Sequence, residues 1–432
     1  MGFLTLALLL TLETFFLIWS ITTKNNHREE KAIISIGLLA LFGLMLVTGV
    51  YEWGFRYVLL LIVLAVQALT GVVILVRKRE KEYKLRKNIF RFVRNCFVFT
   101  FALFIAILCP QYEQPKTTGN HQIAKAKYTW TDNSRVDEFS ETGANRALTV
   151  EFWYPENADE TYPLVIFSHG AFGFSGSNFS TFAELASNGY VVASIGHTYH
   201  AFYTMDTNGT LTTVDPEFIN TASQINAVHD TTHEEEIYHT TKAWMKLRTD
   251  DEHFVINTIR SECENNKADA LFSIINTEKI GLMGHSLGGA ASAQIGRERD
   301  DIDAVIVLDG TMLGEEVAFE NDAIVLNDTP YPVPLLNVYA EDHYTNSMEL
   351  VGDAYNNFYA TQNAVCAYET MFQDAGHLNF TDLPLFSPAL ANMLGVGTID
   401  AQYCIETMNE VVLEFFNCYL KDTGELKIEK EY

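Results

Sequence analysis

The chain has 432 residues, enough for more than one domain, and a formal net charge of −26 that is divided unevenly along its length. Residues 1–110 contain 13 lysines and arginines against 6 acidic residues, whereas residues 111–432 contain 16 against 49. The composition therefore predicts a basic, apolar membrane domain over 1–110 and an acidic domain over 111–432, whose charge would repel phosphate and argues against nucleic acid as a partner.

Four apolar runs within residues 1–110 predict four transmembrane helices. The runs are Gly2–Ile21, Ala32–Val50, Tyr57–Val76 and Asn95–Cys109. The first three are close to the roughly 20 residues that span a bilayer, and the fourth reaches that length if Phe90–Arg94 joins it with its two arginines snorkelling. Glu13 lies inside the first run, where a carboxyl is costly. It indicates either a functional group or a carboxyl that is protonated or paired with another helix.

The basic residues between the runs predict an orientation. Three of them lie between positions 24 and 31, and more lie in Arg77–Lys87, whereas Tyr51–Phe55 has none. Because basic loops stay in the cytoplasm, we expect a multi-pass protein of the cell membrane with residues 111–432 extracytoplasmic. A cleaved signal peptide is the competing interpretation of the first run, but no basic segment precedes that run.

Residues 111–432 alternate between short apolar runs and helical stretches. The runs predict strands at Ala126–Trp130, Leu148–Trp153, Leu164–Phe167, Tyr190–Ile195, Lys279–Met283, Ala304–Leu308, Leu335–Tyr339 and Cys366–Phe372. This alternation predicts the α/β class, with a mostly parallel sheet and helices on both faces. A polar, largely helical segment over 200–275 interrupts it. That insertion is either a cap over the functional site or a decoration remote from it.

Ser286 follows the fifth predicted strand in the sequence GLMGHSLGGA. Gly284 and Gly288 complete the G-x-S-x-G pattern, in which a sharp strand-to-helix turn holds the serine Oγ above the sheet. Such a turn needs neighbours without Cβ, and it directs the next backbone N–H toward an oxyanion. The pattern predicts Ser286 as a nucleophile and the Leu287 N–H as an oxyanion donor. An idle serine in a tight turn is the alternative.

A serine needs a histidine to take its proton, and a second oxyanion donor is expected after an early strand. His377, in FQDAGHLNF, is the only one of the 12 histidines in a loop after the last predicted strand, and it is the predicted general base. The glycine-rich segment VIFSHGAFGFSG supplies the N–H of Ala171 as the second donor. A phosphate-binding loop is the rival interpretation, but neither G-x-G-x-x-G nor G-x-x-x-x-G-K-[ST] is present.

Two positions compete for the acid that orients His377. Asp309 ends the strand directly after the elbow strand, in AVIVLDG, where a glycine eases the turn. Asp342, beside Glu341 in LLNVYAED, follows the next strand, which is where most folds of this class carry the acid. We favour Asp309, with Asp342 as the alternative. An aspartate that only bonds its own turn would be the trivial interpretation of Asp309.

The segments YPLVIFSHG, LASNGYVVASIGH, GHSLGG, VIVLDG and AGHLNF, in this order, resemble the plasma platelet-activating factor acetylhydrolase family, with RALTVEFWYP as the leading strand. The resemblance runs from about Lys127 to His377 and on to the C-terminal helix. It implies an α/β-hydrolase fold, no cofactor, and hydrolysis of short or oxidised acyl esters of phospholipids. It also implies Ser286 as nucleophile, Asp309 as acid and His377 as base. The four apolar runs depart from the family pattern.

Metal ions and disulfides are weakly indicated. His229 and His233 are four residues apart in HDTTHEEE, but no H-E-x-x-H motif or cysteine cluster completes a site, so no metal is expected. An extracytoplasmic domain allows disulfides, and four cysteines are available: Cys263, Cys366, Cys404 and Cys418. The last two are about 21 Å apart along one predicted helix, which is too far for them to pair with each other.

Together these features predict a membrane-anchored serine ester hydrolase, a carboxylic ester hydrolase acting on a lipid or small ester beside the bilayer. A general carboxylesterase acting on soluble or polymeric esters is the alternative within enzymes. A catalytically inactive membrane sensor that uses the hydrolase fold for binding is the alternative from another class.

The loop charges make a testable prediction about topology. Cysteines introduced into Arg77–Lys87 should resist an impermeant thiol reagent in intact cells, whereas cysteines introduced into Gln111–Gln122 should react, because basic loops stay in the cytoplasm. The unmodified chain, with its six native cysteines, is the control. The opposite labelling pattern would reverse the orientation.

Overall fold

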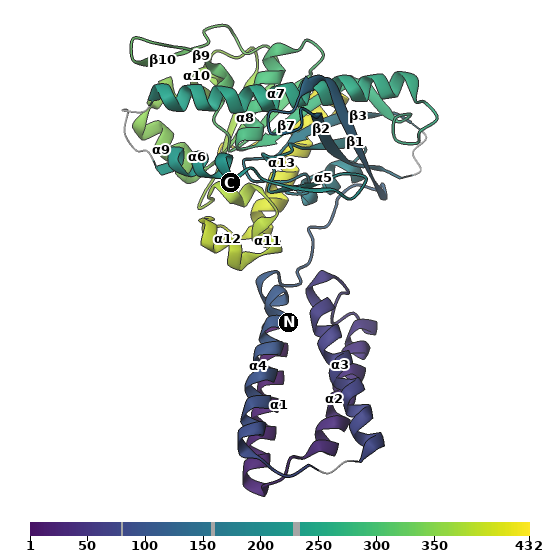
Figure 1. Ribbon diagram of the computed structural model, residues 1–432. Helices are drawn as coiled ribbons and strands as arrows, with labels where there is room; N and C mark the ends of the chain where they lie inside the picture. Colours follow the sequence, from purple (N-terminus) through teal and green to yellow (C-terminus); the bar gives the residue numbers. More distant parts are fainter. Residues whose placement is uncertain (79–80, 157–159, 228–233) are drawn as a thin grey trace. The chain divides into compact units, whose positions relative to one another are not determined.

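The computed structural model describes the chain except for residues 79–80, 157–159 and 228–233, and it divides into two compact units (Figure 1). One unit comprises Met1–Glu113 with Pro384–Met393, and the other comprises Gln114–Leu383 with Leu394–Tyr432.

The first unit contains four long helices, each apolar and long enough to cross a membrane. They are α1 (Gly2–Thr23), α2 (Arg28–Val47), α3 (Phe55–Arg77) and α4 (Leu85–Leu108). Helix α1 packs against α4 and α2 against α3, while α3 also contacts α4 (Figure 1). Helix α4 begins well before Asn95, so the fourth predicted run does extend through Phe90–Arg94. Many of the helices' apolar side chains face outward, as a bilayer would require.

Glu13 has a polar partner within this unit. The Asn95 side-chain amide on α4 donates a 2.8 Å hydrogen bond to the Glu13 carboxyl on α1. A second polar pair lies nearer the helix ends, where the Asn88 amide donates to the Asn26 side-chain oxygen at 3.0 Å. The first contact satisfies a carboxyl that would be costly to leave unpaired in hydrocarbon. It matches the helix-paired interpretation of Glu13.

The second unit is built on an eight-stranded sheet in the order β1-β2-β4-β3-β7-β8-β11-β12. The strands are β1 (Ile123–Val136), β2 (Asn145–Pro155), β3 (Tyr162–Ser168), β4 (Val191–Gly196), β7 (Ile275–His285), β8 (Ala304–Leu308), β11 (Leu335–Ala340) and β12 (Ala367–Phe372). The β1–β2 and β2–β4 pairs are antiparallel and the remaining pairs are parallel. All eight predicted strands are present, and β1 and β7 are longer than their apolar runs.

Helices cover both faces of the sheet, as predicted (Figure 1). Helices α7 (Glu234–Asn265) and α8 (Leu287–Glu298) share one apolar core with the sheet, and α5 (Phe179–Ser187) and α13 (Ala401–Lys421) share the other. Strand β3 is buried at every residue. Parallel strands covered on both faces must be continuously apolar, which explains why their sequences read as apolar runs without alternation.

Smaller elements complete the unit. They are the strand pairs β5 (Tyr203–Met205) with β6 (Leu211–Thr213) and β9 (Glu316–Glu320) with β10 (Ala323–Leu326), and the helices α6 (Pro216–Ala227), α9 (Glu341–Leu350) and α10 (Asn356–Gln362). Two short helices, α11 (Leu383–Phe386) and α12 (Pro388–Leu394), lie almost entirely in the segment Pro384–Met393 of the first unit. The two strand pairs were not predicted, because strands of three to five residues leave little periodicity.

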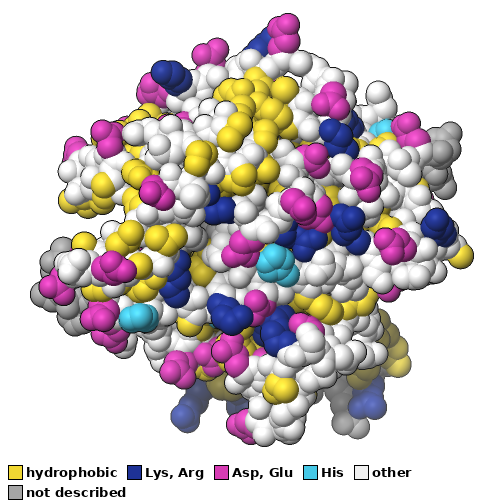
Figure 2. All heavy atoms as spheres, turned by 90° about the horizontal axis from the view of Figure 1, so that it is seen from above, with side chains coloured by type: hydrophobic (Ala, Val, Ile, Leu, Met, Phe, Trp, Pro, Cys, Tyr) yellow, Lys and Arg dark blue, Asp and Glu magenta, His cyan; other side chains and the backbone are white. Residues whose placement is uncertain are grey.

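The acidic surplus of this unit is spread over its surface. Figure 2 shows acidic side chains scattered across the visible face, with lysines and arginines among them. Several of these charges form ion pairs, such as Lys246 with Asp250 at 2.7 Å. This distribution fits a solvated surface that carries excess charge.

Candidate active site

Ser286 occupies the turn between β7, which ends at His285, and α8, which begins at Leu287. Its backbone is strained, with φ 54° and ψ −125°. A Cβ on Gly284 would lie 2.3 Å from the Gly288 backbone, and a Cβ on Gly288 would lie 2.0 Å from the Ser168 carbonyl oxygen at the end of β3. Both glycines are therefore required, because the clashing atoms belong to backbone.

The segment that carries Ala171 passes close to this turn. A Cβ on Gly170 would lie 2.9 Å from His285 Nδ1 and 3.1 Å from the Ser286 Cβ, so a larger residue there would require these neighbours to shift. Ala171 and Leu287 also pack in one apolar cluster with Phe218. The fold thus brings both predicted oxyanion residues to the serine, although they are far apart in the sequence.

Asp309 and His377 form a direct hydrogen bond. The distance from His377 Nδ1 to Asp309 Oδ2 is 2.7 Å. The Asp309 side chain is fully buried, whereas 44% of the His377 side chain is exposed, which leaves the imidazole accessible to a substrate. Burial alone would raise the pKa of Asp309, but hydrogen bonds from His343 and His377 outweigh it and hold the pKa well below its usual range. Asp309 is therefore ionised and able to orient the imidazole.

Strand pairing brings Asp309 to the elbow. The Ser286 N–H donates to the Leu308 carbonyl at 2.9 Å, and the Asp309 N–H donates to the Val338 carbonyl at 2.7 Å. A Cβ on Gly310 would lie 2.3 Å from the Ser286 carbonyl oxygen, so the turn after Asp309 also needs its glycine. The carboxyl ends of β7 and β8 consequently meet beside the serine.

Asp342, the alternative acid, is not bonded to His377 in the part of the chain that the structure describes. Its side chain is exposed in the first turn of α9, where it accepts a 2.8 Å hydrogen bond from the backbone N–H of His343. Its neighbour Glu341 accepts from the Asp374 backbone N–H at 2.6 Å. Only Asp309 of these three acidic candidates is bonded to His377 among the contacts of the described residues.

His285, the residue before the serine, contributes a contact that sequence reasoning missed. Its Nε2 donates to the backbone carbonyl of His377 at 2.9 Å, and the two rings are 4.6 Å apart. Burial lowers the pKa of His285 to about 3, so the ring is neutral and can hold this one orientation. The variable position inside G-x-S-x-G thereby fixes the loop that carries the candidate base.

The insertion over 200–275 supplies residues at the site. Phe218 of α6 and Met245 of α7 pack in the same apolar cluster as Leu287, with Trp244 at its edge. This packing favours the interpretation of the insertion as a cap. His229 and His233 lie outside the described residues. Elsewhere in the described chain, no three histidine, cysteine, aspartate or glutamate side chains are grouped to hold a metal ion.

Helix α7 also supports the segment that carries Ala171. The fully buried guanidinium of Arg248 donates to the His169 carbonyl at 2.7 Å and to the Gly170 carbonyl at 3.4 Å. A guanidinium presents several donors in one plane, so it can hold consecutive carbonyls in a fixed arrangement. With both carbonyls turned toward Arg248, the backbone before Ala171 is held in one conformation.

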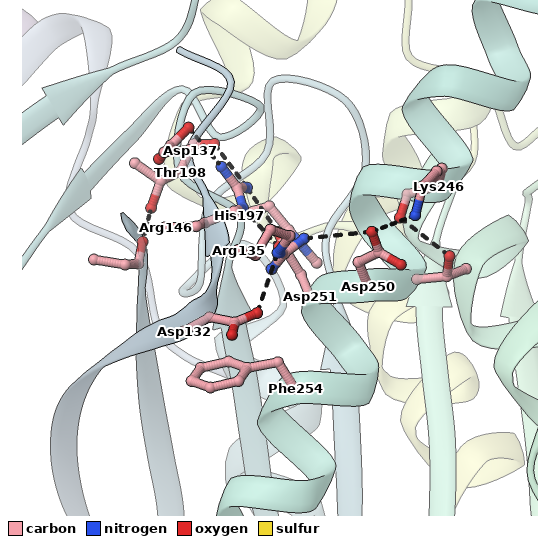
Figure 3. A network of polar contacts seen from close by, with 12 residues as sticks. Asp132, Arg135, Asp137, Arg146, His197, Thr198, Lys246, Asp250, Asp251 and Phe254 are labelled. Carbon is pink, nitrogen blue, oxygen red and sulfur yellow. Dashed lines mark hydrogen bonds and ion pairs between the residues drawn. The ribbon is translucent and has the colours of Figure 1, made fainter. Parts of the chain in front are cut away.

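A buried network of charges continues from this point along α7 (Figure 3). Asp251 accepts hydrogen bonds from Arg146 at 2.6 and 2.7 Å and from Arg135 at 2.6 Å. It also bonds His197 Nδ1 at 3.0 Å, and His197 Nε2 lies 2.9 Å from the Ser168 hydroxyl. This chain has the same three residue types as the candidate site, but all three side chains are fully buried, so it serves structure.

The six cysteines, all among the described residues, are free thiols. Cys404 and Cys418 both lie on α13, consistent with the expectation that they do not pair. Cys366 Sγ instead lies 3.1 Å from the Tyr419 hydroxyl.

Comparison with known proteins places these residues within one family. A family model described as platelet-activating factor acetylhydrolase, isoform II, matches residues 139–429. The chain belongs to this family. The matched segment includes Ser286, Asp309 and His377 and leaves out the four N-terminal helices. Membership of the platelet-activating factor acetylhydrolase family indicates a carboxylic ester hydrolase.

A solved structure agrees with the family assignment at the level of the fold. The chain is similar to a ferulic acid esterase from Streptomyces cinnamoneus, with 20% sequence identity and a TM-score of 0.54 over 72% of this chain and 93% of that one. At this identity the similarity establishes the fold alone. It confirms the predicted α/β-hydrolase fold of this platelet-activating factor acetylhydrolase family member.

The geometry at Asp309 makes a prediction about turnover. Asp309→Asn should lower kcat on the order of 10⁴-fold, because the amide would hold His377 in the wrong tautomer, whereas Asp342→Asn should cost far less. Hydrolysis of p-nitrophenyl acetate by the two purified variants measures the difference. A near-normal Asp309→Asn enzyme would mean that another residue is the acid.

A second prediction concerns the fully buried Glu252 on α7. Burial raises its pKa to about 8, and the positive charge of Arg248 offsets this only in part. The folded chain therefore holds a proton that the unfolded chain releases near pH 4.5, so stability should fall as pH rises toward 8. Between pH 6.5 and 8 the loss should be about 2 kcal/mol.

Thermal unfolding of the full chain in detergent tests this. Glu252→Gln should flatten the decline between pH 6.5 and 8, because the amide cannot ionise. Glu264→Gln, an exposed position on the same helix, is the matched control and should keep the wild-type slope. His197 and His285 titrate near pH 6.5 in the unfolded chain, since burial lowers the pKa of both only in the folded state. That titration is common to the wild type and both variants, so the difference between their curves isolates Glu252. Parallel curves for wild type and Glu252→Gln would contradict the prediction.

Proposed function

We propose that this chain is a membrane-anchored serine ester hydrolase that cleaves short or oxidised acyl esters of phospholipids through an acyl-enzyme on Ser286. The observation that carries the proposal is the 2.7 Å hydrogen bond between Asp309 and His377 beside the strained turn at Ser286. An accessible imidazole, oriented by a buried carboxylate next to a serine, is the arrangement that activates a hydroxyl.

The proposed reaction has two halves. His377 Nε2 takes the Ser286 hydroxyl proton as Oγ attacks the ester carbon, and the backbone N–H groups of Ala171 and Leu287 stabilise the resulting oxyanion. The bond to the alcohol oxygen then breaks as His377 returns the proton to that oxygen. In the second half, a water gives its proton to His377 and attacks the acyl carbon, which releases the acid and restores Ser286. Asp309 stabilises the imidazolium in both halves.

The apolar cluster around the two oxyanion residues supports a short acyl chain. Phe218, Met245 and Leu313 pack in the cluster that contains Leu287 and Ala171, and Phe218 and Met245 are almost fully buried. Side chains already fill this region, which limits the length of chain that fits beside the serine.

The proposed location follows from the four apolar helices and the loop charges. A catalytic unit tethered to the outer face of the membrane would meet lipid esters at high local concentration. Four helices of sufficient length support the anchoring, and the positive-inside rule supports the outward orientation.

Active-site labelling and substrate length test the proposal. A fluorophosphonate probe should label Ser286 in the full chain and fail to label Ser286→Ala. Absence of label together with absence of p-nitrophenyl acetate hydrolysis would favour the inactive sensor. The wild-type kcat/KM should fall by about tenfold or more from p-nitrophenyl acetate to p-nitrophenyl laurate, because side chains fill the apolar cluster beside Ser286.

Phe218→Ala should reduce the ratio of kcat/KM for p-nitrophenyl acetate to kcat/KM for p-nitrophenyl laurate, because it removes a large side chain from the apolar cluster beside Ser286. Phe202→Ala is the matched control, since Phe202 belongs to the same insertion but is 63% exposed, and it should leave the ratio unchanged. Equal rates on acetyl and lauroyl esters in the wild type would refute the short-chain assignment.

A further inference from the structure

Asp309 is bonded by a second histidine besides His377. His343, in the first half of α9, has its Nδ1 2.9 Å from Asp309 Oδ1, and the Ala340 backbone N–H donates to the same oxygen at 2.7 Å. His377 binds the other oxygen, Oδ2, at 2.7 Å. One carboxylate oxygen, Oδ1, thus binds His343 and the Ala340 N–H, and the other, Oδ2, binds the candidate base His377. Rotation of the Asp309 side chain away from His377 would break both contacts to Oδ1.

The far side of His343 is also bonded. Its Nε2 lies 2.6 Å from the Tyr355 hydroxyl, which in turn lies 2.9 Å from the Thr311 hydroxyl. A carboxylate only accepts, so His343 Nδ1 carries a proton and Nε2 of the neutral ring accepts from Tyr355. The hydroxyl groups can reverse their direction if Nε2 gains a proton, so this chain accommodates both charge states of His343.

Aromatic side chains hold the imidazole in place. Tyr339 of β11 and Tyr355 each meet the His343 ring edge-on, at 5.9 and 5.7 Å, and both tyrosines are largely buried with Phe358. Only 21% of the His343 side chain is exposed. A histidine held this rigidly can fix the carboxylate that it binds.

The charged surroundings of His343 favour its protonation. Burial lowers the pKa of His343, but the hydrogen bond and negative charge of Asp309, helped by Asp342, outweigh burial and raise it. The titratable groups that face the ring are Asp309 at the end of β8, Asp342 on its own helix, and the hydroxyls of Tyr339 and Tyr355, with His377 on the opposite side of Asp309. A positive charge on His343 would partly neutralise Asp309 and so weaken its stabilisation of a protonated His377.

We propose that His343 is a positioning residue of the hydrolase: it holds the Asp309 carboxylate toward His377, and its charge state sets how strongly Asp309 stabilises the His377 imidazolium. This inference rests on the proposed function. With neutral His343, Asp309 supports the base fully. With protonated His343, proton transfer from Ser286 to His377 is less favourable, so turnover should decrease at acid pH through two ionisations rather than one.

Two replacements of His343 separate the effect of its hydrogen bond to Asp309 from the effect of its positive charge. His343→Leu removes both contacts to the ring and should lower kcat for p-nitrophenyl acetate about 10- to 100-fold, with KM nearly unchanged, because a hydrogen bond to a charged group is lost. His343→Asn places an amide donor where Nδ1 lies and cannot be protonated. It should restore most of kcat at alkaline pH, and the acid side of its pH profile should show a single ionisation.

Tyr355→Phe removes the outer hydroxyl and should shift the acid side of the profile while retaining most of kcat at alkaline pH. Fluorophosphonate labelling of Ser286 and the unfolding temperature verify that each variant is folded. A wild-type kcat and pH profile in His343→Leu would overturn the inference, as would equal losses in folded His343→Leu and His343→Asn. If His343→Leu does not fold, the pH profile of His343→Asn decides alone, and an unchanged acid side overturns the inference.

Ser286→Ala keeps this test distinct from the test of the function. Full activity in Ser286→Ala would refute the proposed hydrolase mechanism itself. Loss of activity in Ser286→Ala combined with a wild-type pH profile in His343→Leu would leave the hydrolase standing and refute only the role of His343.

Discussion

The close approach of backbone at the elbow is the constraint on which the site depends. Gly288 lies against the carbonyl of Ser168, and Gly170 lies against Ser286, so β3, β7 and the start of α8 meet with no room for a side chain. Ser286, the candidate nucleophile, and the segment carrying Ala171 are therefore positioned by the same contacts. Interiors at this packing density transmit small displacements, so a methyl group at Gly288 would disturb both.

The support beneath the elbow comes from the insertion. Arg248 and Asp251 of α7 take part in a buried network that holds the carbonyls of His169 and Gly170 and the side chain of Arg146. Paired charges of this kind contribute little net stability, because their desolvation offsets their attraction. Here these charges hold the neighbouring backbone and side chains in fixed positions. Helix α7, which contributes to the apolar cluster at the site, also fixes the backbone before Ala171, the candidate oxyanion donor.

The four apolar helices lie outside the segment matched by the family, which begins at residue 139. They make up most of one compact unit, which also includes Pro384–Met393 and in which Glu13 and Asn95 satisfy each other. The other unit has its own two apolar cores, one on each face of the sheet. This separation is consistent with the proposed arrangement, in which a hydrolase unit is joined to a membrane anchor.

Much of this protein could be predicted from sequence because the relevant signals are local. Continuous apolar runs located all eight strands of the main sheet, and the glycines around Ser286 indicated the elbow, because backbone crowding leaves no other residue. The ends of β1 and β7 were underestimated, since polar residues continue those strands beyond the apolar runs. The four long apolar helices could also be predicted, because a run of about 20 apolar residues is typical of a membrane-spanning helix.

The partners of the candidate residues were decided by the tertiary structure. Asp309 and Asp342 both follow buried strands, and only the pairing of β8 with β7 and β11 brings one of them to His377, 68 residues away. His343 and Arg248 carried no motif, because their roles depend on which atoms the sheet order and the packing of α7 bring within hydrogen-bonding distance. Sequence determined where the strands, helices and elbow form, since these follow from neighbouring residues. Tertiary structure decided which distant side chains bond, since those contacts depend on strand order that local patterns do not encode.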